Sequence, residues 1–154
     1  MFAVKTIDIF ESRDGVPFNL FLTNSKANAL QNSFRSLRMN SSTVTKIQPN
    51  PFHLVTSFVL LDSDIEHLSG TVYSSYIRNS RVSKIDGLTV ESLEMCKTKV
   101  ISINQSGALL GLEARLRQLE VTEIKEGGVQ IFGNAELIDV RVSVAEERAI
   151  VIEK

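Results

Sequence analysis

The sequence is poor in the residues that build disulfide or metal scaffolds. It contains one cysteine, Cys96, two histidines and no tryptophan. A single cysteine excludes an intramolecular disulfide and any zinc site made only of cysteines, and this usage is typical of a reducing compartment. His53 and His67 lie 14 residues apart, a spacing that fits no zinc signature. We therefore expect a cytoplasmic or otherwise intracellular protein without a resident metal.

Long apolar runs are also missing. The longest unbroken stretch of aliphatic and aromatic residues is Phe58 to Leu61, far short of the roughly 20 residues that a membrane-spanning helix needs. The first ten residues, MFAVKTIDIF, alternate between polar and apolar and include Lys5 and Asp8, which is typical of a strand and not of a signal peptide. The sequence therefore predicts no contact with a membrane.

What is present is the composition of one globular domain. The chain has 154 residues, of which 43% are hydrophobic and 23% charged, with a formal net charge of −1. This length suits one hydrophobic core better than two, and the composition is not that of a disordered chain. We expect a single α+β domain spanning residues 1–154.

Strand patterns dominate the chain. Period-two alternation and β-branched residues predict a mostly antiparallel sheet, because Gly127-Gly128 offers a tight turn between Val121–Ile124 and Val129–Phe132. Glu146-Glu147 is a second candidate turn. The predicted strands are Phe2–Phe10, Pro17–Leu22, Phe52–Leu61, Leu68–Ile77, Leu88–Met95, Lys99–Ile103, Val129–Phe132, Leu137–Val144 and Ala149–Ile152.

Two segments show helical spacing instead. In Lys26–Met39 the stripe consists of Ala27, Leu30, Phe34 and Leu37. In Ala108–Leu119 it consists of Leu109, Leu112, Leu116 and Leu119. Residues three and four apart share one face of a helix, so we expect two amphipathic helices, at about 26–39 and 108–119, packed on the sheet. Their place among the strands suggests a β-β-α-β-β pseudo-repeat, although any α+β chain of this length alternates such elements.

Charge is distributed unevenly along the chain. No acidic residue occurs between Asp14 and Asp62, a window that holds four basic residues. From Glu113 to Lys154, nine acids against six bases give a net charge of −3. A basic surface attracts phosphates, and Arg and amide side chains contact both phosphates and base edges. The candidate nucleic-acid-binding residues are Asn28, Gln31, Arg35, Arg38, Lys46, Arg78, Arg81 and Lys84.

The expected geometry of this surface favours single-stranded nucleic acid over duplex. On a helix, Asn28, Gln31, Arg35 and Arg38 would form one accessible flank beside the buried stripe. Tyr73 and Tyr76 offer faces on which unpaired bases stack, although a separation of three residues lets only one of them face a given platform. An ordinary solvated helix face is the alternative explanation of the row.

A second feature is the run Leu60-Leu61-Asp62-Ser63-Asp64-Ile65-Glu66-His67. If the strand continues, Asp62, Asp64 and Glu66 lie on one face and could bind Mg²⁺ or Mn²⁺ for phosphodiester cleavage, with His67 as a ligand or base. The alternative is a polar turn between two strands, in which these side chains cap backbone amides or are solvated.

Three functions remain open at this stage. The first is a non-enzymatic module that contacts nucleic acid or supports assembly through its basic N-terminal half. The second is a structural protein that self-associates or binds another protein, for which edge strands offer unpaired backbone groups. The third is a metal-dependent nuclease or phosphodiesterase at Asp62, Asp64 and Glu66. The absence of a recognisable catalytic motif favours a protein that is not an enzyme.

Overall fold

The computed structural model describes residues 5–10, 18–32, 34–50, 52, 54–105 and 107–152. Every regular element in these ranges is a strand, and the strands form one twelve-stranded sheet. In chain order they are β1 Lys5–Phe10, β2 Phe18–Thr23, β3 Ser25–Asn32, β4 Phe34–Asn40, β5 Thr43–Pro49, β6 Val55–Leu61, β7 Asp64–Arg78, β8 Arg81–Ile103, β9 Ala108–Ile124, β10 Val129–Ile131, β11 Asn134–Ala145 and β12 Ile150–Ile152.

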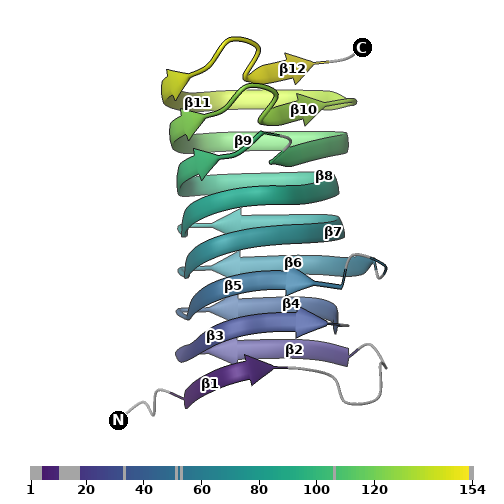
Figure 1. Ribbon diagram of the computed structural model, residues 1–154, viewed down its shortest axis with the longest axis vertical. Helices are drawn as coiled ribbons and strands as arrows, with labels where there is room; N and C mark the ends of the chain where they lie inside the picture. Colours follow the sequence, from purple (N-terminus) through teal and green to yellow (C-terminus); the bar gives the residue numbers. More distant parts are fainter. Residues whose placement is uncertain are drawn as a thin grey trace.

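The strands are wound into a parallel β-solenoid of about six turns. Each strand pairs in parallel with the strand one coil further along the chain, as Ser36 pairs with Ser57 and Ser57 with Ser74. The coils stack along the long axis of the molecule, and the two termini lie at opposite ends of the stack (Figure 1). Residues at equivalent places in successive coils therefore form rows that run along the solenoid axis.

Three sides of the solenoid can be named from these rows. The β2 side contains β2, β4, β6 and the parts of β7, β8, β9 and β11 stacked on them. The β3 side contains β1, β3, β5 and the parts of β7, β8, β9 and β11 stacked on those. The β10 side contains β10, β12 and the parts of β7, β8 and β9 in register with them.

A sharp corner separates the β2 side from the β3 side in every coil. The corner residue has φ between 48° and 52°, a left-handed conformation that polar residues such as Asn and Asp tolerate best among non-glycine residues. Successive corner residues are 17 to 21 positions apart, which gives the length of one coil. They are Asn24, Ser41, Asp62, Asn79, Lys97, Gln118 and Asp139.

The core fills the space inside the coils with stacked rows of apolar side chains. One row runs through Leu22, Met39, Leu60, Ile77, Met95 and Leu116. Two phenylalanines, Phe34 and Phe58, are fully buried with ring centroids 6.1 Å apart. All of these side chains belong to one continuous cluster, so each coil is stabilised by burial against the coils above and below it.

Hydroxyl side chains line the inside of the corner. The backbone N–H of Ser25 donates to Ser42 Oγ, that of Ser42 to Ser63 Oγ and that of Ser63 to Ser80 Oγ, each at 3.2 Å. Each of these three acceptor hydroxyls donates in turn to the carbonyl two residues earlier, as Ser63 Oγ does to Leu61 at 2.6 Å. This serine ladder satisfies amides that the bend removes from the regular strand pairing.

The predicted α+β class is wrong, because no described residue is helical. The segment expected to be a helix at 26–39 forms β3 and β4, and the segment expected at 108–119 lies within β9. The error has a physical cause. Ala27 and Leu30 are both buried, and the two residues between them, Asn28 and Ala29, are more exposed, so the buried residues are three apart as in a helix. The β-β-α-β-β pseudo-repeat fails for the same reason.

The predicted antiparallel pairing is also wrong, since all the strand pairs of the structure are parallel. Gly127 does have a positive φ of 60°, as a tight turn requires. The chain there turns from β9 onto the next side, where β10 pairs with the start of β9 and not with Val121–Ile124. By contrast, all nine predicted strand segments overlap strands of the structure.

Among the described residues no helix is long and apolar enough to cross a membrane.

The serine ladder predicts different costs for two buried serines. Ser63→Ala leaves the Ser42 N–H without its acceptor, so we expect the free energy of unfolding to fall by about 1–3 kcal/mol. Ser75 is the matched control, because its buried hydroxyl has no hydrogen-bond partner. We expect Ser75→Ala to leave stability unchanged or slightly higher. Urea unfolding of both variants measures the difference, and equal losses would contradict a structural role of the ladder.

Candidate functional site

The structure divides the predicted basic surface between two sides of the solenoid. Five of the eight residues lie on the β3 side, and the other three lie on strands of the β2 side. The first group is Asn28, Gln31, Lys46, Arg81 and Lys84, and the second is Arg35, Arg38 and Arg78. The helical flank expected to join Asn28 and Gln31 to Arg35 and Arg38 does not exist, because the chain passes from β3 to β4 between them.

Stacking gathers part of the first group into one row. Lys46 pairs in register with His67, and His67 with Lys84, so three basic side chains occupy successive coils. Acids from β7 and β8 accompany them. His67 Nε2 lies 3.6 Å from Glu66 Oε1, and Lys84 Nζ lies 3.8 Å from Asp86 Oδ2. Two of the three side chains in this row, those of His67 and Lys84, therefore have a carboxylate close by.

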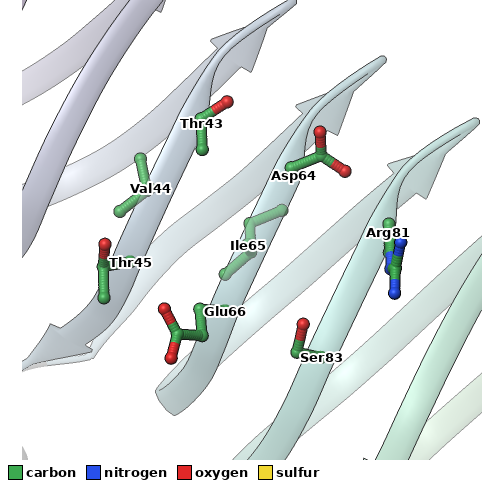
Figure 2. A pocket seen from close by; sticks show the side chains of 8 residues that line it. All are labelled: Thr43, Val44, Thr45, Asp64, Ile65, Glu66, Arg81 and Ser83. Atoms are coloured by element: carbon green, nitrogen blue, oxygen red, sulfur yellow. The ribbon is translucent and has the colours of Figure 1, made fainter.

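The acidic residues of the predicted nuclease site occupy two different places. Asp62 is a corner residue, and its Oδ1 accepts a hydrogen bond of 2.6 Å from Asn79 Nδ2. Asp64 and Glu66 lie on one face of β7, with Ile65 between them pointing to the core (Figure 2). Beside them in register lie Arg81, next to Asp64, and Thr43 on the opposite side.

These carboxylates border a shallow surface hollow on the β3 side. Thr43, Asp64 and Arg81 form one row across it, and Thr45, Glu66 and Ser83 form a second row (Figure 2). Across the described ranges, no group of three His, Cys, Asp or Glu side chains is placed to hold a metal ion. The arrangement is that of an open polar strand face.

The aromatic residues expected to stack on bases differ in exposure. Tyr73 is exposed and Tyr76 is half-buried, and both belong to β7 on the β2 side. They therefore lie on a different side from the row of Lys46, His67 and Lys84.

The feature that the sequence analysis missed is the C-terminal end of the stack. We call it the open end and define it by β11 and β12 (Figure 1). Within the described residues β11 pairs only with β9, and β12 only with β10. The rows that form the core end here: Leu116 is 8% exposed, but Leu137, the next member of its row, is 48% exposed. Exposed Ile150 likewise follows buried Val129.

The other end of the stack is different. Leu20 and Leu22 belong to β2, the first strand of the β2 side, and are 7% and 3% exposed. These two inward residues are therefore covered, whereas Leu137 and Ile150 at the open end are not. The corresponding sequence pattern is the series of apolar residues Leu137, Val140 and Val142. An ordinary buried strand would show a similar series, so the pattern does not reveal that the end is exposed.

Charged side chains lie around the rim of the open end. Glu136 Oε1 lies 3.1 Å from Arg117 Nη2, and Asp139 Oδ1 lies 3.1 Å from Arg141 Nη2. Lys125 lies between β9 and β10, and Glu146 lies between β11 and β12. Lys125 Nζ is 2.6 Å from Glu123 Oε1 and 3.2 Å from Glu146 Oε1. Hydrogen bonds from the Glu126 backbone N–H and from Lys125 hold the pKa of Glu146 below its usual value. Hydrogen bonds to Glu123 and Glu146 raise the pKa of Lys125.

The fold defines a class, the parallel β-solenoid of about six turns. Comparisons of the chain with family models, curated proteins and solved structures found no match.

The lowered pKa of Glu146 gives a pH dependence with a definite sign. Its carboxylate stabilises the fold above the unfolded-state pKa near 4.5, and this contribution disappears as the pH falls through the lower folded-state value. We expect wild type to have a higher Tm than Glu146→Gln at neutral pH, and the two values to converge in acid. Thermal unfolding from about pH 7 to about pH 3 measures this. Glu147→Gln, at the exposed neighbour, should show no such convergence.

Proposed function

We propose that the protein is a non-enzymatic structural module that binds a protein strand at its open end. The observation that carries the proposal is the exposure of Leu137 at the end of a row whose other members are buried. In a solenoid, a terminal coil needs a polar outer face or a partner to cover its core. The open end has neither within the described residues, since Leu137 and Ile150, which continue rows of buried residues, are both exposed there.

Strand addition suits this end for two reasons. The free edge of β11 offers unpaired backbone N–H and C=O groups over most of its length, because β9 occupies only its other edge. The inward side chains next to that edge are apolar, so an added strand of matching alternation would bury them. Main-chain hydrogen bonds would supply affinity, and the apolar rows would select the register of the partner.

The sides of the solenoid support a structural role over catalysis. Several of their charged groups are exposed and pair with neighbours in adjacent coils or on the same strand. Lys99 Nζ lies 3.2 Å from Glu120, and Arg115 Nη2 lies 2.7 Å from Glu113. Such exposed pairs contribute little to stability, and they form a solvated surface instead of a convergent site.

A strand peptide tests the open end directly. The probe is a labelled peptide with the sequence of residues 113–124, EARLRQLEVTEI, which in the chain itself pairs with β11. We expect the full chain to bind it, and Leu137→Lys/Val142→Lys to weaken binding at least about tenfold, because two charges replace apolar contacts. Fluorescence anisotropy gives both dissociation constants.

The matched control is Phe21→Lys/Tyr73→Lys. It places two lysines at the exposed hydrophobic positions Phe21 and Tyr73, which lie in earlier coils, away from the open end. It should bind the peptide as wild type does. Equal weakening in both double variants, or no binding by wild type at a protein concentration at which it is monomeric, would contradict strand addition at the open end.

A second candidate function rests on the row of Lys46, His67 and Lys84. Lys46 and Lys84, with His67 in the coil between them, form a cationic strip along the solenoid axis, which favours an extended anionic polymer such as single-stranded nucleic acid. The neighbouring Glu66 and Asp86 reduce its net charge, and we therefore place this function second.

Lys46→Gln/Lys84→Gln tests the cationic strip. If it contacts phosphates, the double variant should bind labelled single-stranded RNA more weakly and lower the salt slope by roughly one unit or more. Lys97→Gln, an exposed corner residue outside the row, is the control. Anisotropy at two salt concentrations with Mg²⁺ measures both. Unchanged binding would exclude the strip, and cut probes would favour Asp64 and Glu66 as a catalytic pair.

A further inference from the structure

We infer that the open end binds the open end of a second copy of this chain, so that two solenoids form a closed two-fold dimer. This inference rests on the proposed function, because it names the partner of the surface described there. Three observations carry it: the difference between the two ends, the alternation of residues on both sides of the Asp139 corner, and the charges on the rim.

The difference between the ends favours contact between like ends. A head-to-tail arrangement would need two complementary exposed surfaces on one chain and would continue into a filament. Leu20 and Leu22 at the first coil are buried, whereas Leu137 at the last coil is exposed. Among these residues of the β2 side the exposed core lies at one end, and such a surface is satisfied by an isologous contact, which closes after two copies.

The corner at Asp139 gives the position of the two-fold axis. It separates two parts of β11, residues 134–138 on the β2 side and residues 140–145 on the β3 side. Rotation about an axis through this corner places the first part of each copy against the second part of the other, with the strands antiparallel. The β10 side then faces its own copy, which also covers Ile150.

One register places like residues opposite each other. When Leu137 lies opposite Val140 of the second copy, Ala135 lies opposite Val142 of that copy, and all four side chains belong to the inward rows. A shift by one residue would place Leu137 opposite Arg141 and lose this match, because strand side chains alternate between faces. Directly opposite residues of an antiparallel pair have Cβ atoms about 4.5–5.5 Å apart, close enough for contact.

The outward residues agree with the same register. It places Glu136 opposite Arg141 of the second copy, and the two-fold axis repeats this pair. It also places Asn134 opposite Ser143. Opposite charges directly across two strands attract, and like charges repel. The rim is therefore self-complementary in the register that places Leu137 opposite Val140.

Charge reversal tests both the partner and the register. Sedimentation velocity should show a dimer for wild type. Glu136→Arg alone and Arg141→Glu alone should each weaken dimerisation at least about tenfold, since each creates two like-charged pairs. An equimolar mixture of the two variants should restore the dimer, because every pair is then opposite in charge. A wild-type monomer at every concentration, or a mixture no tighter than either variant, would overturn the inference.

Cysteine cross-linking gives an answer that does not depend on those charges. In a Cys96→Ser background, one chain carries Asn134→Cys and another Ser143→Cys, both at exposed polar positions. Mild oxidation of the mixture should give the disulfide-linked heterodimer, and neither chain alone should cross-link. Cross-linking of each chain with itself, or none in the mixture, would exclude this register. If EARLRQLEVTEI binds but wild type stays monomeric, the proposed function stands and only the self-association fails.

Discussion

The parallel pairing of each coil with the next is the constraint on which the rest of this structure depends. Because the pairing keeps equivalent residues in register, each side chain is aligned with the equivalent side chain of the next coil, as Leu37 is with Phe58. Apolar rows build a continuous core, and hydroxyl rows satisfy the amides of the corner. An outward residue such as Lys46 is aligned with His67 whatever their separation in the sequence.

The same constraint concentrates unsatisfied groups at the ends. A residue within the stack has neighbours above and below, and its backbone and side chain are covered on both sides. Leu137 is covered by Leu116 on one side and exposed on the other. The backbone of β11 likewise pairs with β9 along one edge and, among the described residues, leaves its other edge free. The sides, in contrast, carry exposed ion pairs that are already matched within the chain, such as Lys99 with Glu120. For these reasons we place protein association at the open end.

Part of this fold was accessible from the sequence. Period-two alternation located strands such as those around Val55–Leu61 and Leu137–Val144. It failed where the chain bends, because a bend adds an outward residue and changes the apolar spacing from two to three. Leu116 and Leu119 show this around the corner residue Gln118, and the same spacing produced the mistaken helix at 108–119. Pairing partners were not accessible, because equivalent residues recur at irregular intervals of 17 to 21 positions.

The candidate sites divide in the same way. The sequence by itself determined which residues alternate, that Asp64 and Glu66 share a strand face, and that residues 15–61 contain no acid. Only the tertiary structure decided which residues meet. Stacking brought Asp64 of β7 beside Arg81 of β8, and it left rows of the core exposed at one end. A row is created by pairing between coils, and local alternation carries no information about which coil lies next to which.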